Sequence, residues 1–225
     1  FIVGDITVTG GALSSFAASS STVFTATFTP SGAGATTIDV AGTKFTDASS
    51  NNNSAATQFT WTYDNVAPTI AITSTTSGVT TGSTTNDATI ALTFTSNEAT
   101  SNFAQGDITV AGGALSSFAA TSSTVYTATF TPSSAGATTI DVALNEFTDT
   151  AGNNNTAATQ FTWTYDNVNP TLASSSPADN STGFAVGANI VLTFSENVVV
   201  GSGNITLYKS DATLVQAIDV TSGLV

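Results

Sequence analysis

The sequence predicts an all-β protein made of tandem antiparallel β-sandwich domains, and three observations lead to this prediction. Residues 1–68 recur at 103–170 with a constant offset of 102, and 54 of the 68 aligned positions are identical. Polar and apolar residues alternate along most of the chain, as in Phe24-Thr25-Ala26-Thr27-Phe28, which is the period of a β-strand. Turn-forming residues interrupt these segments about every 8–12 residues, a spacing typical of sandwiches.

The repeat divides the chain into three parts. We expect a partial domain at residues 1–66, a complete domain at 67–168, and a partial domain of divergent sequence at 169–225. Phe1 aligns with Phe103, 35 residues beyond Pro68, so the first part lacks its opening strands and the third lacks its closing ones. We therefore expect the native polypeptide to extend in both directions.

Seven strands are expected in the complete domain. They are placed at residues 69–75, 88–96, 107–111, 114–118, 123–131, 137–143 and 157–165. Trp61 and Trp163 alternate with threonine in corresponding strands, which predicts that both indole rings face the core. No segment has a convincing helical period.

Two short linkers join the expected domains, at residues 64–68 and 166–170. Each ends in a proline, whose fixed φ angle restricts the chain where one domain passes into the next. Connections of this length are too short for a loose tether, so neighbouring domains should lie close enough to touch.

The charge is strongly one-sided and excludes several classes of partner. Fifteen acidic residues are balanced by two lysines, Lys44 and Lys209, and the chain has no arginine, which gives a net charge of −13. Nucleic acids and anionic membrane surfaces require basic residues and are excluded. Divalent cations are the natural partners of such a chain, although the acids could instead only keep a threonine-rich surface soluble.

The absence of two residue types limits the chemistry. The chain has no cysteine, hence no disulfide or thiolate metal site, and no histidine, which removes histidine-based triads and the usual zinc sites. No apolar run is long enough to insert into a membrane. Acidic pairs such as Glu146 and Asp149 could suggest glycoside hydrolysis, but no substrate cleft is indicated. We expect no enzymatic activity.

Strand order predicts a metal site at the junction of two domains. Successive strands of an antiparallel sandwich alternate in direction, so the preceding linker and every second loop lie at the same end of the domain. Carboxylates from this linker and these loops should converge there, and Ca²⁺ prefers six to eight oxygen ligands. The expected ligands are Asp64, Glu98, Asp107 and Asp149, with an additional oxygen from Asn153.

The same geometry predicts a second junction site formed by Asp166 and Glu196. This site is expected to be weaker, because Asn204 occupies the position that corresponds to Asp107. The alternative at both junctions is turn chemistry, in which each aspartate caps a loop through its own backbone.

Three stretches carry a resemblance to a known family. They are GDITVAGGALSSF at 106–118, FTDTAGNNNTAATQFTWTYDNVNPT at 147–171, and SSSPADNSTGFAVGANIVLTFSENVVVGSGNITLYKS at 174–210. The first two resemble the bacterial Ig-like repeats of very large secreted adhesins, and the third resembles a divergent type of bacterial Ig-like domain. The resemblance implies tandem immunoglobulin-like antiparallel β-sandwich domains, arranged as calcium-stiffened rods on bacterial surfaces.

These observations predict a non-catalytic spacer segment of a large, repetitive extracellular protein. Its expected partners are the neighbouring Ig-like domains of the same chain, with cell-surface or homotypic protein contacts also possible. Three alternatives remain at this point. They are a domain of a phage or virus appendage, a self-assembling extracellular filament completed by strand addition, and ligand binding to glycan or ice through outward threonine faces.

Overall fold

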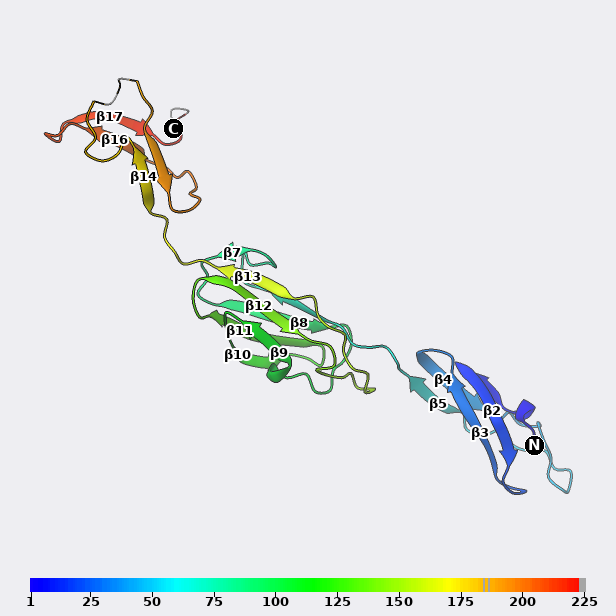
Figure 1. Cartoon of the computed structure of the whole chain (residues 1–225). Helices are drawn as coiled ribbons and strands as arrows, with labels where there is room; N and C mark the ends of the chain where they lie inside the picture. The colour runs from blue at the N-terminus through cyan, green and yellow to red at the C-terminus, as the bar shows by residue number, and fades with distance from the viewer. Residues whose placement is uncertain (184, 186, 223–225) are drawn as a thin grey trace. The chain divides into compact units, whose positions relative to one another are not determined.

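The structure is a computed structural model that describes residues 1–183, 185 and 187–222. The chain forms two compact units, Phe1–Asn167 and Val168–Val225. It is almost entirely β, with several antiparallel sheets (Figure 1), which confirms the predicted Ig-like sandwich class. The described residues contain no helix with the length and apolar character needed to span a bilayer.

The complete sandwich lies between residues 67 and 167 and has two four-stranded sheets. The first has the order β10-β11-β8-β6 and the second the order β7-β13-β12-β9. The strands are β6 (Ile70–Ser74), β7 (Thr84–Thr85), β8 (Ile90–Ser96), β9 (Ile108–Ala111), β10 (Gly113–Ala120), β11 (Val125–Pro132), β12 (Gly136–Val142) and β13 (Phe161–Tyr165). All pairings are antiparallel except that of β7 with β13.

The seven expected strands are present, and β7 is an eighth that the sequence did not predict. It consists of Thr84 and Thr85, which pair in parallel with Thr164 and Tyr165. Two threonines have no polar–apolar alternation, so the pattern that revealed the other strands was absent here. The Thr85 hydroxyl accepts a hydrogen bond from the indole nitrogen of Trp163 at 3.1 Å, which gives the buried ring its polar partner.

The core of this sandwich consists of the inward-facing residues of both sheets. Trp163, Phe94, Phe130 and Ile140 are at most 1% exposed. Burial of each such side chain stabilises the fold by roughly 1.5–3 kcal/mol. Several of the aromatic rings meet edge to face, as Phe130 and Trp163 do at a centroid distance of 6.3 Å.

Residues 1–66 repeat the later part of this sandwich. They form a short 3₁₀ turn, η1 (Val3–Asp5), and five strands, β1 (Thr7–Thr9), β2 (Gly11–Ala18), β3 (Phe24–Pro30), β4 (Gly34–Asp39) and β5 (Phe59–Tyr63). The sheets are β2-β3 and β1-β4-β5. Trp61, expected in a core, is 43% exposed, because the described residues of this copy include no equivalent of β6, β7 or β8.

The second compact unit contains two separate two-stranded sheets. β14 (Leu172–Ser176) pairs with β15 (Val191–Phe194), and β16 (Asn204–Tyr208) pairs with β17 (Leu214–Asp219). Its strands carry exposed apolar side chains, among them Leu172 and Phe194.

Candidate metal centre

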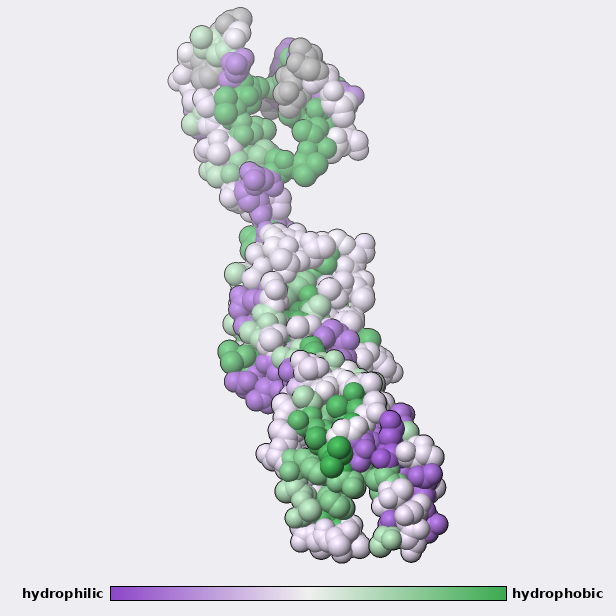
Figure 2. Space-filling view, turned by 90° about the vertical axis from the view of Figure 1, so that its right-hand side faces the viewer, coloured by the Kyte–Doolittle hydropathy of each residue, from purple (hydrophilic) through white to green (hydrophobic). Residues whose placement is uncertain are grey.

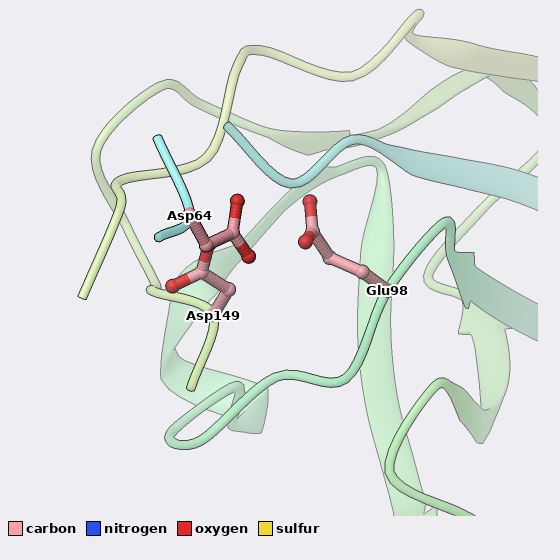
Figure 3. A group of neighbouring side chains, drawn as sticks. All are labelled: Asp64, Glu98 and Asp149. Atoms are coloured by element: carbon pink, nitrogen blue, oxygen red, sulfur yellow. The ribbon is translucent and has the colours of Figure 1, made fainter. Parts of the chain in front are cut away.

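Three of the expected ligands meet at one end of the complete sandwich. Carboxylate oxygens of Asp64, Glu98 and Asp149 lie within 4.8 Å of one another (Figure 3). Asp64 directly follows β5, Glu98 lies two residues after β8, and Asp149 lies in the long loop between β12 and β13. The alternating strand directions bring these positions to the same end of the sandwich, as strand order had predicted.

Asp149 is held by its own loop. One carboxylate oxygen accepts hydrogen bonds from the backbone N–H groups of Ala151 and Asn153, at 2.8 and 2.9 Å, and the other accepts one from the Asn153 side chain at 2.8 Å. The residue is only 2% exposed. Burial acts to raise the pKa of Asp149, but the hydrogen bonds from Asn153, Gly152 and Ala151 outweigh it and hold the pKa below its usual value.

Asp64 connects the linker to this loop. One of its carboxylate oxygens accepts a hydrogen bond from the Val66 backbone N–H at 3.0 Å, and its main-chain carbonyl accepts one from the Asn153 side chain at 3.3 Å. Pro68, a few residues on, is fully buried, and its carbonyl accepts a hydrogen bond from the Thr156 N–H. The linker is therefore fastened to the domain that follows it.

Glu98 completes the group under electrostatic strain. Burial raises the pKa of Glu98 above its usual value, and the negative charges of Asp64 and Asp149 raise it further, while a hydrogen bond from Asn97 acts in the opposite direction. Like charges at this distance repel one another, and at Glu98 this repulsion disfavours the ionised form. A divalent cation between them would reverse the sign of that interaction, and oxygen-only ligands suit Ca²⁺.

Two expected ligands have other roles in this structure. The Asp107 carboxylate lies at the end of the 3₁₀ turn η2 (Gln105–Asp107), where it accepts the Ala104 backbone N–H at 2.8 Å, and it is not part of the group. Asn153 does lie beside the group, but its amide nitrogen rather than its oxygen meets Asp149. Asp107 lies outside the group because its carboxylate bonds to the backbone N–H of Ala104, only three residues earlier in the same turn.

The residues of the second expected site lie in different compact units, Asp166 in the first and Glu196 in the second. The Asp166 backbone N–H donates to the Thr85 carbonyl. One oxygen of Glu196 is buried without a hydrogen-bond partner among the described residues. This site stays a prediction.

The first copy shows the same turn without the cluster. The carboxylate of Asp47 accepts the Ser49 and Asn51 backbone N–H groups and the Asn51 side chain, as Asp149 does with its own loop. No group of three acids forms around Asp47 among the described residues. The hydrogen bonds of Asp149 within its own loop are therefore explained by the turn alone, since Asp47 makes the same bonds. What distinguishes Asp149 is that the carboxylates of Asp64 and Glu98 lie beside it.

Asn155 is a residue whose role sequence reasoning missed. It is 2% exposed, and its side-chain oxygen accepts the Glu146 and Phe147 N–H groups while its nitrogen donates to the Ala143 and Thr156 carbonyls. These four bonds shape the loop that carries Asp149. The run Asn153-Asn154-Asn155 was the available signal, but it does not indicate which asparagine turns inward.

Comparison with protein families places all three parts of the chain. Residues 1–63 and 64–165 match one family model described as a bacterial Ig-like domain, and residues 166–223 match a second model with the same description. A search of curated proteins gave no match.

Proposed function

This chain belongs to the bacterial Ig-like domain family, and on that premise we propose that it is a spacer segment of a large extracellular surface protein, stiffened by calcium. Bacterial Ig-like domains are typically structural modules of surface proteins and are known as non-catalytic modules. In this proposal the chain sets the distance and the freedom of movement between parts of an adhesin-like protein. It binds no substrate.

The observation that carries the proposal is the position of Asp64. It is a linker residue, yet its carboxylate lies within 4.8 Å of carboxylates from two loops of the following domain. An ion bound at this point would hold the linker and both loops together. It would restrict bending about the linker, which is the property that a spacer requires.

Charge supports the same proposal. The three carboxylates carry up to three negative charges with no basic residue among them, because the chain has only Lys44 and Lys209. Without a cation their repulsion opposes folding, and with one it becomes attraction. An ion that binds only the folded protein stabilises it by about 2.7 kcal/mol when its concentration is 100 times Kd.

The test is thermal unfolding of the whole chain in EDTA and in millimolar Ca²⁺. We expect Ca²⁺ to raise the Tm and Asp149→Ala to abolish the rise. Asp47→Ala is the matched control, because Asp47 makes the same turn without the acidic neighbours. Small-angle X-ray scattering under both conditions should show a narrower distribution of dimensions with Ca²⁺.

Identical melting curves and scattering profiles with and without Ca²⁺ would refute the calcium part of the proposal. The spacer role would then depend on the short proline linkers alone. A rise that survives Asp149→Ala but is lost in Asp47→Ala would place the ion elsewhere in the chain.

A further inference from the structure

The complete sandwich contains a strand that adds little to its core. β7 consists of Thr84, which is exposed, and Thr85, which is half-buried, and it pairs in parallel with the end of β13. At the height where Figure 1 places β7, the face shown in Figure 2 is mostly white, the colour of intermediate hydropathy. Burial of apolar side chains is therefore not the main contribution of β7. Its contribution is a set of hydrogen bonds to the last strand of the domain.

These hydrogen bonds join β7 and the segment before it to β13 and the residue that follows it. Some connect two backbone groups and others end on a threonine hydroxyl, with donor–acceptor distances of 2.7–3.4 Å. With the donor named first, they run from Gly82 to Thr162, from Thr164 to Ser83, from Asp166 to Thr85, from Thr162 to Thr81 and from Trp163 to Thr85.

Thr85 takes part in both kinds of bond. Its carbonyl accepts the Asp166 backbone N–H at 2.9 Å, and its hydroxyl accepts the indole N–H of Trp163 at 3.1 Å. The same hydroxyl donates to the Asp87 carboxylate at 2.6 Å. An indole nitrogen only donates and an ionised carboxylate only accepts, so the hydroxyl has one orientation that satisfies both partners. Thr85 is thus bonded to a buried ring of β13 and to the point where the chain leaves the domain.

The chain enters and leaves this sandwich at opposite ends. At the entry, the Pro68 carbonyl accepts the N–H of Thr156, which precedes β13. β13 then runs to the other end, where the chain leaves at Asp166; in Figure 1 the entry is cyan and the exit yellow. A pull on both linkers therefore acts along β13. The hydrogen bonds of a sheet run across its strands, so such a pull loads them all together instead of one after another.

We propose that β7 holds β13 in place when the chain is under tension, and that Thr85 is the residue that fastens the two strands. This proposal rests on the spacer role, since a segment that sets a distance in a surface protein transmits the pull on that protein. It does not involve the candidate metal centre, because the bonds between β7 and β13 include none of its carboxylates.

The chain has no cysteine, so a pair of introduced cysteines defines the two points of a mechanical pull. Asn65→Cys and Asn167→Cys lie in the two linkers, where both residues are exposed, and load the sandwich along β13. Ala111→Cys and Ser134→Cys lie at the open end of the β10–β11 hairpin and peel these two strands apart. Force spectroscopy of the whole chain in EDTA then gives the lifetime of the folded sandwich at a fixed force, which reports its unfolding rate.

We expect a lifetime about tenfold longer or more when the linkers are pulled than when the hairpin is peeled. Thr85→Val keeps the shape of the side chain but removes both bonds of its hydroxyl. It should shorten the lifetime under the linker pull by about tenfold and leave the peeling lifetime unchanged. Thr84→Val, at the exposed neighbour, is the matched control. Thr85→Ser restores a hydroxyl and should restore the lifetime.

Three results would overturn the proposal. They are equal lifetimes of the wild type in the two directions, a Thr85→Val chain that lasts as long as Thr84→Val under the linker pull, and a Thr85→Val chain whose lifetime falls by the same factor in both directions. The last result would make Thr85 a contributor to general stability alone. Because every measurement is made in EDTA, failure here leaves the calcium-dependent Tm standing, and failure of that test leaves the role of β7 standing.

Discussion

The Asn153 side chain donates a 2.8 Å hydrogen bond to the carboxylate of Asp149, and Asn51 repeats this bond to Asp47 at 2.9 Å in the first copy. The two pairs differ in burial, since Asp149 is 2% exposed and Asp47 is exposed. One turn thus recurs in two environments. Substituting the same asparagine in each copy can therefore separate the contribution of the hydrogen bond to stability from the effect of burial.

Asn153→Ala should lower the stability of the complete domain at neutral pH by about 1–3 kcal/mol, the usual cost of losing a hydrogen bond to a charged group. Its hydrogen bonds help to lower the pKa of Asp149, so this contribution is present above the usual aspartate pKa. It is lost as the pH falls through the lowered value. Denaturant unfolding from pH 7 to pH 2 in EDTA measures both effects. Asn51→Ala is the control, and an equal loss in both variants would contradict a role for burial.

Glu98→Gln should raise the Tm in EDTA at pH 7. The pKa of Glu98 is raised in the folded state, so the folded protein binds more protons there, and stability falls as pH rises from the usual glutamate pKa through the raised one. The neutral glutamine removes this penalty. A series of melting curves against pH should show the fall in the wild type and its absence in the variant.

The same variant should have the opposite effect in millimolar Ca²⁺, where Glu98→Gln removes a ligand and lowers the Tm relative to the wild type. A Tm change of the same sign in EDTA and in Ca²⁺ would contradict the metal site. Glu146→Gln, an acidic residue of the β12–β13 loop outside the group, is the control for a general charge effect.

Asn155→Ala should be among the most destabilising polar substitutions. It removes the partner of two backbone N–H groups and two carbonyls, and each group left unsatisfied in a buried position costs about 1–3 kcal/mol. Denaturant unfolding gives the loss, and a change of less than about 1 kcal/mol would show that water replaces the amide. Asn53→Ala removes the same four bonds from the first copy, where Asn53 is half-buried, and should cost less.

Trp163→Ala should cost about 3–5 kcal/mol, the usual loss for a large aromatic side chain in a packed core. Trp61→Ala should cost much less, because 43% of that side chain is already exposed. Both tryptophans belong to the same repeated sequence. The Thr36 hydroxyl donates a hydrogen bond to the main-chain carbonyl of Trp61, and the Thr138 hydroxyl donates the equivalent bond to that of Trp163. Thermal unfolding of the two variants compares them directly. Equal losses would contradict the difference in burial between the two indole rings.

Strand positions were predictable to within a few residues because alternation is a local property of the chain. The polar–apolar pattern at β8 and β13 reports which side chains face inward, and no distant residue is needed to interpret it. β7 was missed because two threonines carry no such pattern. Its parallel pairing with β13 depends on the path of residues 75–89, which no local signal describes.

The candidate site was predictable only as a region. Strand order placed Asp64, Glu98 and Asp149 at one end of the sandwich, and the structure brings these three together. In the structure the Asp107 carboxylate instead accepts a hydrogen bond from the Ala104 N–H and lies outside this group. Whether an acid joins a cluster or caps its own turn is decided by differences of a few ångströms in loop path, and sequence spacing does not contain them.

The sequence by itself determined the repeat, the sandwich class, the inward residues of each strand and the acidic character of the surface, because all of these follow from composition and local periodicity. Only the tertiary structure decided that Trp163 is covered and Trp61 open, and which three carboxylates meet. Both depend on contacts between segments far apart in the chain. Identical local sequences therefore have different environments wherever their distant partners differ.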